Sequence, residues 1–84
     1  MKAVVTVTLK SGVLDPQGKA IEGALASLGF AGVGSVRQGK IFEIDIVETD
    51  PARAAAALKD MAEKLLANTV IEKYRVELVQ GPEA

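Results

Sequence analysis

Two kinds of hydrophobic spacing alternate along this chain of 84 residues, and together they predict its elements. Apolar residues at every second position indicate a half-buried strand, whereas spacings of three and four indicate an amphipathic helix. The first pattern predicts strands over residues 2–10, 41–48 and 71–80, with a weaker one from Val33 to Arg37. The second pattern follows the pairs Asp15-Pro16 and Asp50-Pro51, so the predicted order is β-α-β-β-α-β.

The residues at the element boundaries support these helices and turns. Asp at an N-cap accepts free N–H groups of the first turn, and Pro at the first helical position has no N–H to leave unpaired. Gly29 and Asn68 are the expected helix terminators, because both residue types tolerate left-handed backbone. Gln38-Gly39 predicts a hairpin turn in which Gly39 takes a positive φ.

The predicted fold is α+β: a two-layer sandwich in which both helices cover one face of a single antiparallel sheet. No linker divides the chain, so residues 1–84 form one domain. The face opposite the helices carries more apolar residues than a water-facing sheet should, namely Val4, Ile41, Val47 and Val79. We expect the protein to form a homodimer through its sheet; the alternative is an ordinary surface with scattered valines.

Charge and composition argue against nucleic acid and membranes as partners of this chain. The net charge is −1 and charged residues make up 25% of the chain, which argues against nucleic-acid binding, since that needs a basic surface. No apolar run approaches the length of a membrane span. The chain enters a strand pattern at once without a signal peptide, so the expected location is the cytoplasm.

The chain offers little chemistry of its own. It contains no Cys and no His, which removes the thiol nucleophile and the commonest general base and metal ligand. Glu43, Asp45 and Glu48 are carboxylates that suit a hard cation, although a solvated strand edge explains them better. The sequence therefore predicts no catalytic residue, no metal site and no cofactor bound by this chain.

Two segments are candidate partner contacts. The first is the loop into the first helix, made of Gly12, Val13, Leu14, Asp15, Pro16, Gln17, Gly18 and Lys19. The second is the turn with Arg37, Gly39 and Lys40. The plainer interpretations are a structural corner and a solvated hairpin tip. Gly18 weakens a helix, so its presence indicates close approach of another backbone.

Three functional hypotheses remain open on these residues. The chain is an assembly subunit of an enzyme whose chemistry lies on other chains, a regulatory module that binds a small ligand at the corner, or an enzyme that uses carboxylates. A metabolite that raises the melting temperature of the isolated protein would favour the regulatory module.

Four blocks of the sequence resemble one family. With x for the positions that do not carry the resemblance, they are LKxGVLDPQGxA from Leu9, ALxxLG from Ala24, VRxGK from Val36 and LLANxVIExY from Leu65. Together they resemble PurS, the small subunit of phosphoribosylformylglycinamidine synthase, over nearly the whole chain. One departure is Thr69, where the family usually has Pro, and it leaves the corner before the last strand less rigid.

The resemblance implies a role in purine synthesis. In that family a glutaminase subunit releases ammonia, and a large synthetase subunit uses it with ATP and Mg to convert formylglycinamide ribonucleotide. The small subunit is dimeric, bridges the other two and assists ammonia transfer. The resemblance thus implies three partners for this chain: a second copy, the large synthetase subunit and the glutaminase subunit.

Overall fold

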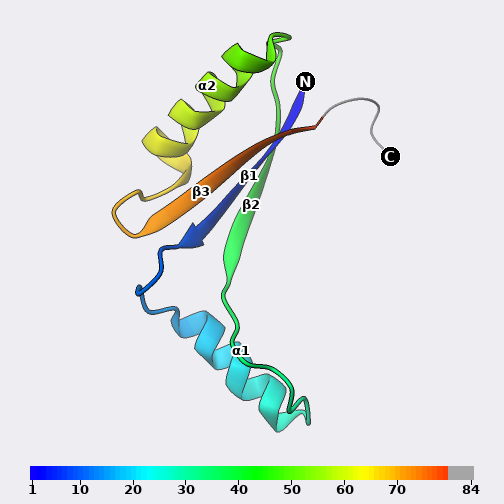
Figure 1. Ribbon diagram of the computed structural model, residues 1–84, viewed down its shortest axis with the longest axis vertical. Helices are drawn as coiled ribbons and strands as arrows, with labels where there is room; N and C mark the ends of the chain where they lie inside the picture. The colour runs from blue at the N-terminus through cyan, green and yellow to red at the C-terminus, as the bar shows by residue number, and fades with distance from the viewer. Residues whose placement is uncertain (80–84) are drawn as a thin grey trace.

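The computed structural model describes residues 1–79 as a three-stranded antiparallel sheet with two helices (Figure 1). The strands are β1 (Lys2–Leu9), β2 (Gly39–Asp45) and β3 (Glu72–Val79), and the sheet order is β2-β1-β3. The helices are α1 (Pro16–Ser27) and α2 (Pro51–Met61), and α2 ends in a π-helical turn, η1 (Ala62–Leu66). The predicted α+β class and antiparallel sheet are confirmed. The tail from residue 80 lies outside the described residues.

The core lies between the central strand and α2. Val5 pairs with Phe42 on one side and Val76 on the other, and alternate residues of β1 are almost fully buried. Leu58 of α2 packs into the same cluster. Because side chains alternate between the two faces of a strand, these residues identify the covered face, as the hydrophobic pattern predicts.

Both predicted helix starts are confirmed, and so is the end of the first helix. Asp15 accepts a hydrogen bond from the Gly18 N–H and Asp50 accepts one from the Ala52 N–H. Gly29 has a φ of 96°. The Gly29 N–H donates to the Ala26 carbonyl, and the Phe30 N–H to the Leu25 carbonyl. This is the hydrogen-bond pattern of a Schellman motif.

Three local predictions are wrong. The segment from Val33 to Arg37 forms no strand, since its glycines and small residues offer little to pair or bury. Gln38-Gly39 is not a hairpin turn and Gly39 does not have a positive φ; Gly39 begins β2 opposite Thr8. Asn68 is not left-handed either, because η1 already unwinds the helix and Ala67 is extended. Instead, the Asn68 side chain accepts a hydrogen bond from the Val70 N–H.

The position of α1 also differs from the prediction that both helices cover the sheet. Within the described residues, only α2 packs extensively against a strand, and that strand is β3. Figure 1 shows α1 beyond the end of the sheet, with the chain returning alongside it towards β2. The described molecule is therefore long and thin, with principal extents of 48 × 33 × 14 Å.

Candidate functional site

The two segments predicted as contacts meet through the carboxylate of Asp15. Its Oδ1 accepts a hydrogen bond from the Gly18 N–H at 2.8 Å, and its Oδ2 accepts one from the Gln38 N–H, also at 2.8 Å. These two donors, Gln38 first, hold the pKa of the Asp15 carboxyl below its ordinary value of 3.8. The side chain is 6% exposed, so Asp15 caps α1 and also ties the corner to the approach of β2.

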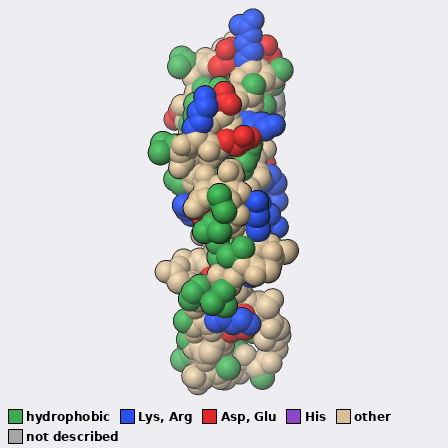
Figure 2. Space-filling model, turned by 90° about the vertical axis from the view of Figure 1, so that its left-hand side faces the viewer, with side chains coloured by type: hydrophobic (Ala, Val, Ile, Leu, Met, Phe, Trp, Pro, Cys, Tyr) green, Lys and Arg blue, Asp and Glu red, His purple; other side chains and the backbone are tan. Residues whose placement is uncertain are grey.

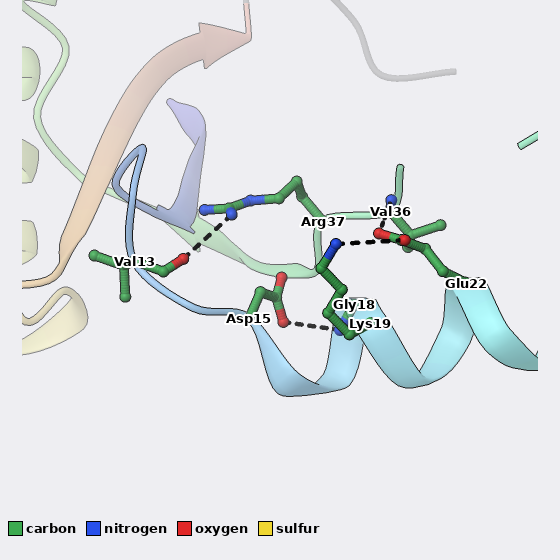
Figure 3. Close-up of polar contacts among 7 residues, drawn as sticks. All are labelled: Val13, Asp15, Gly18, Lys19, Glu22, Val36 and Arg37. Atoms are coloured by element: carbon green, nitrogen blue, oxygen red, sulfur yellow. Dashed lines mark hydrogen bonds and ion pairs between the residues drawn. The ribbon is translucent and has the colours of Figure 1, made fainter. Parts of the chain in front are cut away.

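Arg37 makes a second connection, from the returning segment back to the loop that precedes α1. Its guanidinium donates to the carbonyls of Leu9, Lys10 and Val13 at 3.2, 3.1 and 3.3 Å. These carbonyls belong to the end of β1 and to the loop that follows. Figure 3 shows Arg37 reaching from the returning segment to Val13 while Asp15 turns towards Gly18. The two side chains thus cross-link the loop and the returning segment.

Close backbone contact completes this unit. A Cβ built on Gly18 would lie 2.3 Å from the Val36 carbonyl oxygen, which confirms the prediction that Gly18 permits another backbone to approach. The Val36 N–H donates to Glu22 Oε2 at 2.9 Å, and Lys19 pairs with Glu22 at 3.6 Å (Figure 3). We call residues 12–22 with residues 36–38 the clasp.

The eleven candidate contact residues fall into three groups in the structure. Asp15 and Gly18 are buried inside the clasp, so they brace it rather than present a surface. Val13 is half-buried. The remaining eight are exposed: Gly12, Leu14, Pro16, Gln17, Lys19, Arg37, Gly39 and Lys40. Gly12 has a φ of 86°, which suits glycine in a tight turn.

Lys40 lies at the edge of the clasp. Its ammonium is 3.9 Å from the Glu72 carboxylate and 5.8 Å from the centroid of the Phe42 ring. A small hollow of about 220 Å³ lies between Gln17, Gln38, Lys40 and Glu72. A second hollow, of about 440 Å³, opens on the clasp itself between Leu14, Lys19 and Arg37.

Of the exposed apolar residues in and beside the clasp, sequence reasoning named only Leu14 as a contact and missed the others. Leu14, Leu28 and Phe30 are 71%, 73% and 58% exposed, and Val33 and Ile21 are also exposed. In Figure 2 hydrophobic side chains gather at the surface where the sheet gives way to α1. The helical spacing predicts that Ile21 and Leu28 are buried, but it predicts that the chain's own sheet buries them.

The described residues contain no group of three or more acidic side chains placed to hold a metal ion. Glu43, Asp45 and Glu48 are therefore not brought together as a cation site. Among these residues no helix is long and apolar enough to cross a membrane.

Comparison with known proteins decides among the functional hypotheses. The family model described as PurS, phosphoribosylformylglycinamidine (FGAM) synthase, matches residues 2–80. The chain belongs to the PurS family. It is 51% identical over 75 residues to the phosphoribosylformylglycinamidine synthase subunit PurS of Mycobacterium leprae, covering 89% of this chain and 91% of that protein.

Two solved structures show the same fold. PurS of Methanocaldococcus jannaschii, described as a subunit of formylglycinamide ribonucleotide amidotransferase in the purine biosynthetic pathway, matches with a TM-score of 0.82 and 41% identity. That match covers 90% of this chain and 92% of the other. A chain in the structure of PurLQS from Thermotoga maritima matches with a TM-score of 0.84 and 32% identity, covering 90% and 93%.

This protein is therefore a subunit of phosphoribosylformylglycinamidine synthase, an enzyme of purine biosynthesis. The hypothesis of an assembly subunit is confirmed over the regulatory module and the carboxylate enzyme.

Proposed function

We propose that this PurS chain is a non-catalytic coupling subunit. It bridges a glutaminase subunit and an ATP-dependent synthetase subunit and assists the passage of ammonia between them. The observation that carries the proposal is the match to a chain of the PurLQS structure over nine-tenths of the length of both chains. Glutaminase chemistry of this type needs a Cys–His pair, and this chain contains neither residue. ATP and Mg belong to the large subunit, and the complex works in the cytoplasm.

The clasp is the proposed contact with these subunits. Its internal hydrogen bonds use the Asp15 and Arg37 side chains, so the surface offered to a partner is that of Leu14, Gln17 and Lys19. Since the clasp is fixed by many bonds, it presents this surface with little loss of conformational entropy on binding.

Reconstitution tests the coupling role. The synthetase and glutaminase are mixed with and without this chain, and product formation is measured with glutamine and then with ammonia as the nitrogen source. We expect omission to abolish the glutamine-dependent reaction and to leave the ammonia-dependent reaction largely intact. Equal glutamine-dependent rates with and without the chain would overturn the proposal.

A charge reversal tests the contact surface in the same assay. Lys19→Glu places an acid on the exposed side of the clasp, and Lys59→Glu makes the same change on the exposed surface of α2. We expect Lys19→Glu to raise the concentration of this chain needed for half-maximal coupling by about tenfold, since like charges juxtaposed at an interface cost several kcal/mol. Lys59→Glu leaves that concentration unchanged. Equal effects of the two changes would remove the clasp from the interface.

Self-association through the sheet is the second part of the proposal. The face of the sheet opposite α2 exposes Ile41 and Val79, and Val47, just beyond β2, is 96% exposed. A small chain that leaves this much apolar surface open gains stability by burying it against another copy. Light scattering at micromolar concentration should therefore give at least twice the chain mass of 8.8 kDa.

A further inference from the structure

Four apolar side chains are exposed where the end of the second helix turns into β3. Leu65 and Val70 are 83% and 80% exposed, and Met61 and Ile71 are also exposed in part. We call these four residues the corner; Figure 1 shows this part of the chain at the left, where the yellow end of the helix leads into the orange strand. Clustered apolar exposure of this kind marks interaction sites, and neither the clasp nor the sheet face opposite α2 includes it.

The π-helical turn is the reason that Leu65 is exposed. Leu58 and Ala62 are fully buried on the side of the helix that faces the core. Seven residues make nearly two turns of an α-helix, so an unbroken α-helix would place Leu65 below Leu58, on the core. In η1 the Ala67 N–H donates to the Ala62 carbonyl, five residues back, and Leu66 packs against the core instead. The extra residue of the π-turn thus exchanges one leucine for the next.

This exchange brings no gain to the folding of the single chain. An α-helix with one residue fewer would bury Leu66 at the same core position and would leave one leucine fewer in water. Turns of the π type are rare and occur frequently at functional sites. The exposure of Leu65 therefore serves a contact outside the single chain.

The corner is continuous with the clasp and has cations at its border. The Lys10 N–H donates to the Ile71 carbonyl at 2.9 Å, and the Lys10 carbonyl accepts a hydrogen bond from Arg37 at 3.1 Å. Lys64 precedes Leu65, and neither Lys10 nor Lys64 forms an ion pair within residues 1–79. The complementary surface is therefore an apolar pocket bordered by carboxylates, placed beside the contact for the clasp.

We propose that the corner docks into such a pocket on the synthetase subunit, and that the π-turn presents Leu65 to it. The inference rests on the coupling function proposed above and adds a second surface to the clasp. Apolar contacts suit a lasting association. The synthetase acts with either nitrogen source, whereas the glutaminase is needed only with glutamine, so the synthetase is the lasting partner.

Two single-residue deletions test the role of the π-turn. Deleting Lys64 removes the extra residue, keeps Leu66 on the core and moves Leu65 to the exposed position of Lys64. Deleting Lys59 removes another exposed lysine of the same helix, but it moves Glu63 into the buried position of Ala62. We expect the Lys64 deletion to melt at or above the parent temperature and the Lys59 deletion to melt about 10 °C or more below it. A Lys64 deletion that melts as low as the Lys59 deletion would make the π-turn a requirement of the fold and overturn its proposed role.

Reconstitution of the complex tests the docking. Leu65→Gln removes the exposed apolar side chain, and Ala56→Gln makes a similar change at an exposed position of α2. We expect Leu65→Gln and the Lys64 deletion to raise the concentration of this chain needed for half-maximal coupling by at least about tenfold. Ala56→Gln stays within about twofold of the parent. Light scattering of the isolated variants should give the mass of the parent, and a lower mass would assign Leu65 to self-association and overturn the docking.

Photochemical cross-linking in the reconstituted complex identifies the occupant. A photoreactive phenylalanine analogue replaces Leu65 in one protein and Ala56 in its control. We expect attachment of the synthetase from position 65 and none from position 56. Attachment of the glutaminase or of a second copy from position 65 would overturn the proposal.

The outcomes separate this inference from the proposed function. If omission of the parent chain leaves the glutamine-dependent rate unchanged, the coupling function fails and the inference fails with it. If the parent chain couples the two reactions and Leu65→Gln does so at the same concentration, the docking of the corner alone is overturned.

Discussion

The two Asp-Pro pairs show how identical residues acquire different roles. Both aspartates cap a helix, but the exposed carboxylate of Asp50 has its partners within its own turn: it accepts the Ala52 N–H and pairs with Arg53 at 3.7 Å. Asp15 also accepts the Gln38 N–H, a residue 23 positions away. The capping role follows from local chemistry, whereas the second hydrogen bond exists only because the returning segment passes beside the helix start.

Asp15 should make the stability of the protein depend on pH in the acid range. Its pKa is lowered in the folded chain, so the unfolded chain binds the proton more readily, and the stabilisation is lost as pH falls through the folded pKa. We expect the stability gap between the parent and Asp15→Asn to be constant above about pH 5 and to narrow below pH 4. Urea unfolding of both proteins at a series of pH values measures this difference in the free energy of unfolding. A difference that grows as the pH falls would contradict a lowered pKa of Asp15 in the folded chain.

Gly18 and Gly23 form a matched pair within α1. A Cβ on Gly18 would lie 2.3 Å from the Val36 oxygen and 2.9 Å from Asp15 Oδ2, whereas a Cβ on Gly23 meets nothing within 4 Å. We expect Gly18→Ala to destabilise the fold by about 1–3 kcal/mol through overpacking. Gly23→Ala should stabilise it by about 0.5–1 kcal/mol through helix propensity. Chemical denaturation measures the free energy of unfolding of both variants. If helix propensity alone mattered, both variants would be more stable than the parent, which would contradict the close contact at Gly18.

At the scale of elements, one side-chain contact fastens the end of the second helix to the sheet. The Tyr74 hydroxyl on β3 donates to Glu63 Oε2 on η1 at 2.6 Å. That hydrogen bond raises the pKa of Tyr74 from 10.0 to about 12. The helix spacing and the strand alternation predict both elements, but neither pattern pairs these two residues.

This contact gives a spectroscopic prediction, because Tyr74 is the single tyrosine and the chain has no tryptophan. We expect ultraviolet titration of the phenol to show a midpoint near 12 in the parent and one closer to the ordinary value in Glu63→Gln, which lacks the carboxylate charge. Since the folded pKa is raised, the stabilisation is complete below the unfolded pKa and is lost as pH rises towards the folded one. Identical midpoints in the two proteins would show that the contact does not form in solution.

For the molecule as a whole, the small hydrophobic core limits the free energy of unfolding of the single chain. The fully buried side chains larger than alanine are Val5, Val7 and Leu58 in the described part of the chain, and α1 adds almost nothing to this cluster. A domain of this size in which one helix does not pack on the core has a small free energy of unfolding as a single chain.

Self-association should therefore appear in the thermal stability. We expect the melting temperature to rise by roughly 5 °C or more over a hundredfold increase in protein concentration, because dimerisation favours the folded state by mass action. A parent melting temperature independent of concentration would mean that the folded chain is stable alone.

The sequence by itself determined the three strands of the sheet, their buried faces, both helix starts and the glycine that ends α1, because period and capping chemistry act over a few residues. Its family blocks also determined the function, which the comparisons confirm. Only the tertiary structure decided where α1 points, that the backbone which approaches Gly18 is that of Val36, that Asp15 joins two segments, and that Arg37 serves the fold. The physical reason is that a hydrophobic stripe records the need for burial without specifying the surface that meets it, whether in the same chain or in another.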